Sequence, residues 1–237
     1  MIRFYAPDIL ATAKLPAEES AHAIRVLRRR IGDEVEAVDG RGNLYRCRLL
    51  TDDHRGATVE IVETLELPKV WKPSITVAVA PTKHADRMEW LVEKLVEIGV
   101  DRIVPLRCAR SERKEIKTER LVKIAVSAMK QSLKAVLPKI DDTTPLKDFL
   151  KENQSGCRFV GYCDENTERR LLAQAYLPGS DATILIGPEG DFSPEEIKAC
   201  IDAGYVPVTM GDNRLRTETA ALVGCDTIHI VNQTMNI

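Results

Sequence analysis

The spacing of apolar and polar residues divides the chain into two parts with different periodicities. In the first part, apolar residues alternate with polar ones over short runs, which is typical of half-buried strands. Strands are predicted at 34–38, 44–50 and 57–62, and the Asp-Gly-Arg-Gly-Asn turn at 39–43 predicts a hairpin between the first two. One helical stretch is expected at 17–29, where apolar residues recur at helical spacing. A small β-barrel or sandwich with one helix is therefore predicted for residues 1–67.

The second part begins after a linker at 65–73, where two prolines interrupt any regular pattern. Continuous apolar runs predict strands at 75–80, 102–106 and 158–163. Helical stripes predict a helix over 88–98 that stops at Gly99, a long helix around 121–129 that Pro138 ends, and another that starts at Thr144-Pro145. This alternation predicts an α/β domain with a parallel sheet over residues 74–237.

The most informative stretch is 182–223, where two strands each lead through a glycine turn into a helix. The strand at 182–186 runs into Gly187-Pro188-Glu189-Gly190, and the following helix opens with the capped start Ser193-Pro194-Glu195-Glu196 and ends at Gly204. The strand at 206–210 runs into Gly211-Asp212-Asn213, and a second helix begins near Thr217. Both turns therefore lie at the carboxyl ends of strands, where open α/β sheets bind their ligands.

Composition narrows the cellular setting. Of 237 residues, 44% are hydrophobic and 30% charged, a balance typical of globular proteins. The six cysteines form no CxxC pair and the four histidines are scattered, so we expect no metal site and reduced thiols. The apolar runs are too short to cross a membrane, and the first residues do not begin a signal peptide. A cytoplasmic protein without a membrane partner is expected.

Positive charge is concentrated in two places, although the net charge is only −2. Seven Lys and Arg stand against three Glu between residues 107 and 123, and another cluster comprises Arg25 and the arginines at 28–30. The near-neutral total argues against a general nucleic-acid coat, whereas local basic patches favour contacts with RNA phosphates. The candidate RNA-binding residues are Arg25, Arg28, Arg29, Arg110 and Lys134, and the first three are expected to share one helical face.

The glycine turns lack two common nucleotide-binding signatures. No Lys-Ser/Thr pair follows the glycines, as a P-loop requires, and no G-x-G-x-x-G follows a strand, as a dinucleotide site requires. Both absences count against an NTPase and a nicotinamide enzyme. From the residues alone, a tight turn with a capped helix and a ligand site are equally supported.

The motifs together resemble a known family. Ile186-Gly187-Pro188-Glu189-Gly190, Met210-Gly211 and Leu215-Arg216-Thr217-Glu218-Thr219-Ala220 resemble the knot-fold (SPOUT) methyltransferases, and in particular the ribosomal RNA small subunit methyltransferase E family. His22, Val26-Leu27-Arg28, Gly32-Asp33 and Asp39-Gly40 are similar to its amino-terminal barrel, which is related to the PUA RNA-binding fold. Lys83, Lys94, Glu97, Arg120 and Gln131-Ser132 are similar to its first helices. The resemblance covers nearly the whole chain.

The resemblance implies transfer of a methyl group from S-adenosyl-L-methionine to N3 of a uridine in 16S ribosomal RNA of the small subunit. It also implies a homodimer and a SPOUT-type parallel sheet with a C-terminal trefoil knot, preceded by a PUA-like β-barrel. The residues expected to bind the cofactor are Ile186, Gly187, Pro188, Glu189, Gly190, Met210, Gly211, Leu215, Arg216 and Thr217. The chain departs from the family pattern at Lys130, Lys134, Asn213 and Arg214.

The chemistry of the reaction assigns roles to individual residues. Gly187, Gly190 and Gly211 are expected to let the backbone approach the adenosine closely. Loss of the uracil N3 proton leaves negative charge, which Arg216 is predicted to stabilise, and Glu218 is the candidate general base. The structural alternatives are an ion pair for Arg216 and a helix-terminus charge for Glu218.

Two other functions are compatible with the residues. One is a ribose 2′-O-methyltransferase of the same fold, which the amino-terminal barrel and the Leu-Arg-Thr-Glu-Thr-Ala run disfavour. The other is a non-enzymatic RNA-binding factor, which the intact Gly187, Gly190, Gly211 and Arg216 disfavour.

Overall fold

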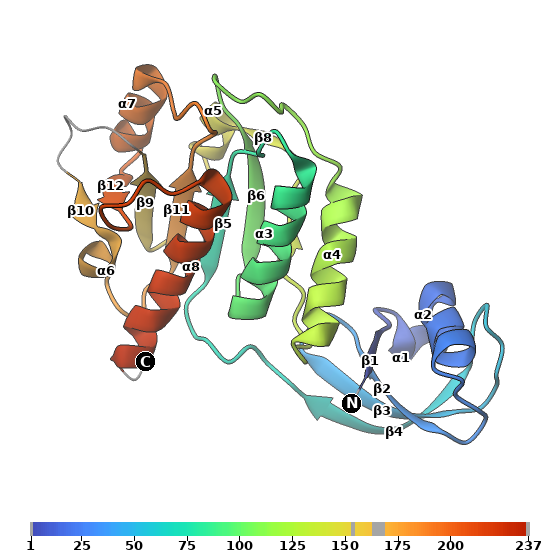
Figure 1. Cartoon of the computed structure of the whole chain (residues 1–237). Helices are drawn as coiled ribbons and strands as arrows, with labels where there is room; N and C mark the ends of the chain where they lie inside the picture. Colours follow the sequence, from blue (N-terminus) through green and yellow to red (C-terminus); the bar gives the residue numbers. More distant parts are fainter. Residues whose placement is uncertain (1, 153–154, 163–168, 236–237) are drawn as a thin grey trace. The chain divides into compact units, whose positions relative to one another are not determined.

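The structure, a computed structural model, describes residues 2–152, 155–162 and 169–235 (Figure 1). The chain forms two compact units. One comprises residues 1–70 together with 126–137, and the other comprises 71–125 together with 138–237. A single boundary at 65–73 was predicted from the sequence, so the assignment of the internal segment 126–137 to the first unit was not expected.

The first unit contains a four-stranded sheet in the order β1-β2-β3-β4. Its strands are β1 (Arg3–Tyr5), β2 (Glu34–Val38), β3 (Asn43–Leu49) and β4 (Val59–Glu66). The predicted hairpin is confirmed, since β2 and β3 pair antiparallel with Val38 opposite Leu44. Buried Asp39 holds this turn by accepting the backbone N–H of Arg41 at 2.7 Å and of Asn43 at 3.2 Å. β1 pairs parallel with β2, so the sheet is mixed.

The predicted helix over 17–29 is shorter and irregular in the structure. It consists of α2 (Ala17–Ala21) and a wide π-helical turn, η1 (His22–Val26), and a further short helix, α1 (Ile9–Thr12), precedes it. The chain then leaves the helix because Arg28 adopts a left-handed conformation, with φ 56°, and the N–H of Arg29 bonds to the carbonyl of Ala23 at 3.0 Å. Arg25, Arg28 and Arg29 therefore do not share a helical face, and that prediction is wrong.

Residues 126–137 complete the first unit. They include the last turns of α4 (Thr118–Gln131) and the segment that follows it. Lys130 forms an ion pair with buried Glu19, with 2.5 Å between Nζ and Oε1, and the N–H of Gly42 bonds to the carbonyl of Ala135 at 2.9 Å. The helix ends at Gln131 rather than at Pro138, because Leu133 turns the chain at φ 55°.

The second unit is built on a parallel sheet whose main path runs β10-β12-β9-β11-β5-β6-β7, with β8 paired to β6. The strands are β5 (Ile75–Val79), β6 (Arg102–Arg107), β7 (Lys139–Ile140), β8 (Thr144–Pro145), β9 (Cys157–Gly161), β10 (Arg170–Leu171), β11 (Ala182–Ile186) and β12 (Val206–Thr209). Every residue of β5 and of β11 is buried, as the continuous apolar runs predicted. The parallel sheet is therefore confirmed; Cys163, the predicted end of β9, lies outside the described residues.

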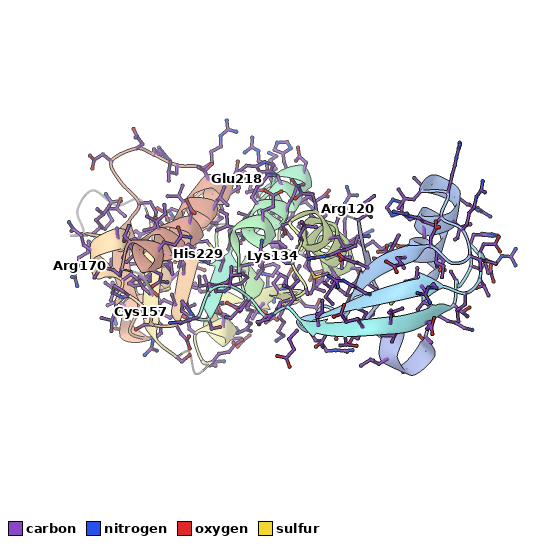
Figure 2. The ribbon with its side chains drawn as sticks, turned by 90° about the horizontal axis from the view of Figure 1, so that it is seen from below. Arg120, Lys134, Cys157, Arg170, Glu218 and His229 are labelled. Atoms are coloured by element: carbon purple, nitrogen blue, oxygen red, sulfur yellow. The ribbon has the colours of Figure 1, made fainter. Side chains whose placement is uncertain are left out.

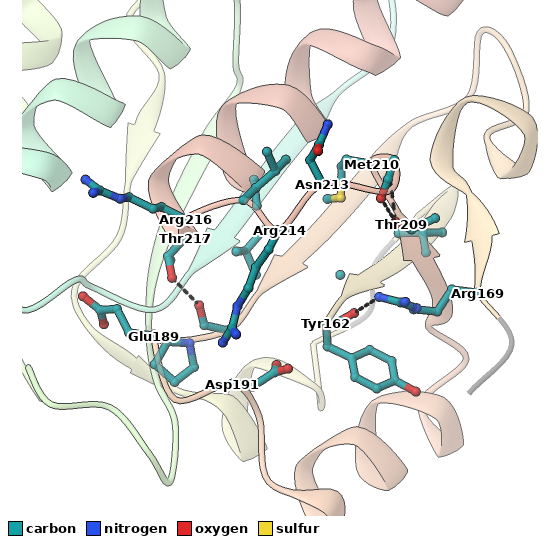
Figure 3. Close-up of a pocket in the computed structure, with 18 of the residues that line it drawn as sticks. Tyr162, Arg169, Glu189, Asp191, Thr209, Met210, Asn213, Arg214, Arg216 and Thr217 are labelled. Atoms are coloured by element: carbon teal, nitrogen blue, oxygen red, sulfur yellow. Dashed lines mark hydrogen bonds between the residues drawn. The ribbon is translucent and has the colours of Figure 1, made fainter. Parts of the chain in front are cut away.

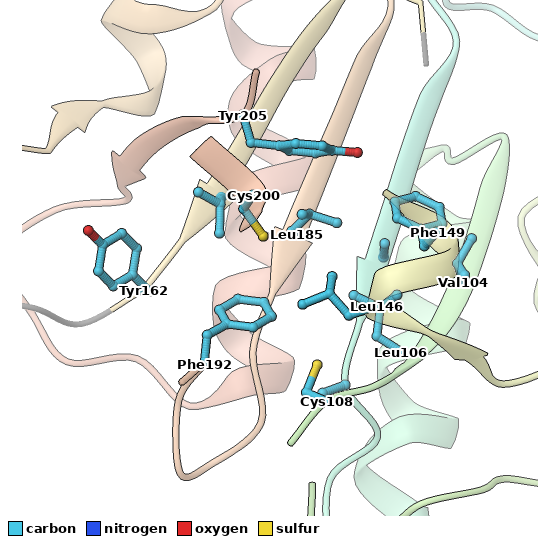
Figure 4. Close-up of a cluster of buried hydrophobic side chains, with 13 residues drawn as sticks. Val104, Leu106, Cys108, Leu146, Phe149, Tyr162, Leu185, Phe192, Cys200 and Tyr205 are labelled. Carbon is cyan, nitrogen blue, oxygen red and sulfur yellow. The ribbon is translucent and has the colours of Figure 1, made fainter. Parts of the chain in front are cut away.

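Helices cover both faces of this sheet. On one face α3 (Ala85–Ile98) and α8 (Thr217–Thr234) lie side by side over β5 and β11 (Figure 1). On the other face, side chains of α5 (Leu146–Phe149) and α7 (Pro194–Asp202) form a core with inward residues of the central strands; α6 (Leu172–Ala175) follows β10. Figure 4 shows this core, with Phe149 and Phe192 among its members. The trefoil knot stays a prediction.

Candidate functional site

A cavity of about 1000 Å³ opens where β9, β11 and β12 end (Figure 3). Its walls are the loop between β11 and α7, the loop between β12 and α8, and the first turn of α8. All ten residues predicted to bind the cofactor line it: Ile186, Gly187, Pro188, Glu189, Gly190, Met210, Gly211, Leu215, Arg216 and Thr217. Two turns about twenty residues apart in the sequence thus form one site, of the size that small-molecule sites have.

The first loop is held by a capped helix and by an arginine. Ser193 and Glu196 form the predicted capping box at the start of α7. The second carboxylate oxygen of Glu196 accepts the backbone N–H of Ala109 at 2.7 Å. Arg110 donates from one nitrogen to the carbonyls of Gly190, at 3.1 Å, and Phe192, at 3.3 Å. Arg110, predicted to bind RNA, therefore supports the cavity wall in this structure.

Gly187 packs tightly against its own loop. A Cβ atom at this position would lie 3.0 Å from the ring of Phe192, so the glycine allows that buried ring to close the turn. The carbonyl of Gly187 accepts a hydrogen bond from the hydroxyl of Thr217 at 3.2 Å, which joins the two loops. Packing inside the loop therefore disfavours a side chain here.

Gly211 is required by its backbone conformation. Its φ of 128° lies in the region that favours glycine, and no atom of the described residues lies within 4 Å of a Cβ built there. The hydroxyl of Thr209 donates to the carbonyl of Gly211 at 2.7 Å and accepts its N–H at 3.2 Å, which fixes the turn. The open space beside Gly211 belongs to the cavity.

Other elements supply a part of the cavity wall that was not predicted from the sequence. Arg87 reaches the cavity from α3, and Gly161, Tyr162 and Arg169 reach it from the end of β9 and the segment beyond it. Arg169 donates to the carbonyl of Tyr162 at 2.9 Å. Gly161 could have been predicted to line the cavity, because it lies at the end of a third parallel strand. The further lining residues are Asp191, Val208, Thr209, Asp212, Asn213, Arg214 and Ala220.

Two arginines of the second loop are exposed, and they point differently. In Figure 3 the side chain of Arg214 runs across the cavity towards the first loop, whereas that of Arg216 points away from it to the other side. Arg216 is the N-cap residue of α8, yet its side chain makes no capping hydrogen bond. Among the described residues it has no ion-pair partner. The structural alternative for Arg216, an ion pair, therefore has no support in this structure.

The surroundings of Glu218 differ from those expected of the predicted general base. It comes from the first turn of α8, the helix that also carries His229 (Figure 2). It is only 6% exposed and is not among the residues that line the cavity. Its Oε1 lies 3.8 Å from Nε of Arg87, and its buried Oε2 has no hydrogen-bond partner among the described residues. This conformation gives Glu218 no direct contact with a ligand in the cavity.

The remaining candidate RNA-binding residues belong to the first unit. Arg25, Arg28 and Arg29 are exposed, and Lys134 is half-buried just after α4. Since Arg110 belongs to the second unit, the five residues are divided between two compact bodies. No group of three or more His, Cys, Asp or Glu in the described ranges is arranged to hold a metal ion. Nor is any helix within these ranges long and apolar enough to cross a membrane.

The cavity fits S-adenosylmethionine chemically. Its two loops offer backbone groups at the carboxyl ends of strands, which suit hydrogen bonds to adenosine. Glu189, Asp191 and Asp212 line it, so acidic groups are available near a cationic sulfonium. Met210 and Leu215 add apolar surface to the cavity, which suits an aromatic ring such as adenine.

Comparisons with known proteins identify the family. The family model described as an RNA methyltransferase domain matches residues 70–229, and that of an RNA methyltransferase PUA domain matches residues 15–62. Ribosomal RNA small subunit methyltransferase E of Mycobacterium bovis is 31% identical over 235 residues, which cover 95% of this chain and 88% of that protein. Its namesake from Aquifex aeolicus is 30% identical over 225 residues, covering 92% and 95%.

Solved structures agree over the full length. A probable rRNA-methyltransferase from Porphyromonas gingivalis superposes with a TM-score of 0.94 at 44% identity, over 99% of this chain and 100% of that one. Ribosomal RNA small subunit methyltransferase E from Neisseria gonorrhoeae, bound to S-adenosyl methionine, superposes with a TM-score of 0.82 at 26% identity, over 98% of each chain. The chain therefore belongs to the ribosomal RNA small subunit methyltransferase E family of RNA methyltransferases, with the SPOUT-type sheet and PUA domain that its motifs indicated.

Proposed function

We propose that this protein transfers the methyl group of S-adenosylmethionine to N3 of a uridine in 16S ribosomal RNA of the small subunit. One observation carries the proposal. The ten residues expected to bind the cofactor come from two separate turns, at 186–190 and 210–217, yet all of them line one cavity. The chain that forms this cavity belongs to the ribosomal RNA small subunit methyltransferase E family.

The bound cofactor supplies an activated methyl group, so the protein must orient two reactants and manage one proton. The two loops hold the cofactor through their backbone, and the bond from Thr217 to Gly187 keeps them at a constant separation. Arg216, exposed at the start of α8, stabilises the negative charge that develops on the uracil. It can do so only after its side chain turns towards the bound base, because it points away in this structure (Figure 3).

The RNA is held mainly through its phosphates. The first unit, which carries the exposed Arg25, Arg28 and Arg29, serves as a docking domain, and the second unit binds the cofactor and carries out the reaction. Lys134 adds positive charge to the docking unit. Because N3 of uracil is hidden in a duplex, the target must be unpaired or extruded.

We further propose that the protein acts in the cytoplasm as a homodimer. Trp90 on α3 is 42% exposed and Ile230 on α8 is 50% exposed, so both of these neighbouring helices present a large apolar side chain that a second copy of the chain could bury. Light scattering coupled to size exclusion should give twice the chain mass of 26.5 kDa.

The test of the reaction is direct. Small subunits from a bacterial strain that lacks its own enzyme of this family are incubated with the protein and labelled cofactor, and the RNA is then digested to nucleosides. We expect label in 3-methyluridine alone. Label in a 2′-O-methylnucleoside would favour the ribose methyltransferase, and tight subunit binding without label would favour a non-enzymatic RNA-binding factor.

A further inference from the structure

Arg87 and Glu218 form a charged pair beside the cavity that the proposed mechanism does not use. Arg87 lies in the first turn of α3 and lines the cavity, whereas Glu218 lies in the first turn of α8 and does not. The Glu218 side chain is 8% exposed and that of Arg87 is 33% exposed. The pair therefore connects a buried carboxylate to a cation at the cavity wall.

The geometry suits Glu218 for holding another group rather than for reacting itself. A buried carboxylate needs a positive partner, and the first turn of α8 supplies only part of it through the unpaired backbone N–H groups. Of the residues that the structure describes, Arg87 is the cation within ion-pair distance of Glu218, with 3.8 Å between Nε of Arg87 and Oε1 of Glu218. This distance is too long for a hydrogen bond, so the pair has room to tighten when a ligand binds.

Arg87 has binding capacity left over. A guanidinium carries five N–H donors, and only the Nε edge of Arg87 faces Glu218. The side chain makes no hydrogen bond to any other described residue, and a third of it is exposed at the cavity. Its free edge is therefore suited to an oxyanion, which arginine binds through two parallel hydrogen bonds.

We propose that Arg87 binds a backbone phosphate next to the target uridine, and that Glu218 is a positioning residue that orients Arg87. This inference rests on the proposed function and deepens it. A base inserted into the cavity brings its flanking phosphates to the cavity mouth. Arg87 comes from α3 and not from the two loops expected to hold the cofactor, so it is available to contact the substrate at the same cavity. Glu218 then acts through Arg87 instead of accepting the uracil proton.

The experiment compares Arg87→Gln, Arg87→Lys, Glu218→Gln and the double Gln variant with the wild type. Lys198→Gln is the matched control, because Lys198 is an exposed cation of α7 that is paired with Asp202 and does not line the cavity. Binding to undermethylated small subunits is measured over a salt series, cofactor affinity by calorimetry, and methylation by single turnover at saturating subunits.

Arg87→Gln should weaken subunit binding about tenfold and lower the salt-dependence slope by about one, while cofactor affinity stays unchanged. Arg87→Lys should restore the slope but only part of the affinity, because it keeps the charge and loses the fork. Glu218→Gln should weaken subunit binding in the same direction, and should add little to Arg87→Gln because the two residues act as a unit. At saturating subunits both single variants should react within about threefold of the wild-type rate.

Three results would overturn the inference. Wild-type subunit binding and slope for Arg87→Gln would leave Arg87 without a phosphate contact. A loss of cofactor affinity with unchanged subunit binding would mean that the oxyanion is the cofactor carboxylate. A large loss of the saturating rate in Glu218→Gln alone would restore Glu218 as the general base. If the wild type itself does not methylate the subunits, the proposed function fails instead, which separates the two outcomes.

Discussion

Replacing Arg216 with Met should make the protein more stable and less active. A positive charge at the N-terminus of a helix opposes the helix dipole and costs roughly 0.3–1 kcal/mol at low ionic strength. Arg216 occupies the N-cap of α8 without making a capping hydrogen bond, and its exposed side chain has no ion-pair partner among the described residues. Among the described residues, removing the charge therefore loses no capping hydrogen bond and no ion pair. For a protein of this size the gain corresponds to a rise in Tm of about 1–4 °C.

The same substitution removes the group that we assign to the developing uracil anion. Loss of one such donor lowers turnover by roughly a hundredfold or more, and leaves cofactor affinity nearly unchanged because the benefit arises in the transition state. Thermal unfolding in low and high salt, calorimetric titration with the cofactor and single-turnover methylation measure the three quantities. The rise in Tm should vanish in high salt, because surface charge effects are screened.

Lys198→Met is the control for this experiment, since it removes an exposed cation that has a partner, Asp202, 2.5 Å away. Its Tm should not rise and its turnover should not change. A Tm several degrees lower for Arg216→Met would show that the side chain stabilises the fold. Methylation at the wild-type rate would refute its role in stabilising charge.

Three further predictions test other parts of the structure. Gly187→Ala should lower both the midpoint of urea unfolding and cofactor affinity, since its Cβ would lie 3.0 Å from a buried aromatic ring. Gly211→Ala should strain only the turn, so it should reduce cofactor affinity with little change in that midpoint. Lys130→Met should destabilise the first unit by up to about 3 kcal/mol in urea unfolding, because it leaves the carboxylate of Glu19 buried and unpaired; a wild-type midpoint would contradict this. Burial raises the pKa of Asp39, but hydrogen bonds from its turn outweigh burial and hold the pKa below its usual value. This carboxylate therefore stabilises the fold above about pH 4 and ceases to do so as the pH falls through its lowered pKa. Asp39→Asn should therefore lose roughly 1–3 kcal/mol at pH 7 and differ progressively less from the wild type in acid; a constant difference between pH 7 and pH 2 would show that the charge is not involved.

Local signals in the sequence were sufficient for much of the second unit. The continuous apolar runs of β5 and β11 predicted buried parallel strands, because only strands covered on both faces dispense with polar alternation. The capping box at Ser193 and Glu196 was predictable because its residues bond to each other within one turn. The ten candidate cofactor residues were selected by the family resemblance; they lie together because each turn follows its own strand, and parallel strands end at the same edge of the sheet.

The tertiary structure alone decided the features that depend on distant contacts. Residues 126–137 joined the first unit through bonds to Glu19 and Gly42, which no periodicity could reveal, so a fragment cut at residue 70 would leave that segment without its partners. The helix predicted over 17–29 ended at Val26 in a π-helical turn, and Ala23 of that turn lies in the core of the first unit, a contact with distant residues that periodicity does not reveal. Glu218 reads as an exposed helix-start residue in the sequence, yet the neighbouring α3 buries it and brings Arg87 to its side. Spacing along a chain determines which residues face the same way within one element, but the burial and partners of a charge depend on which other element packs over it.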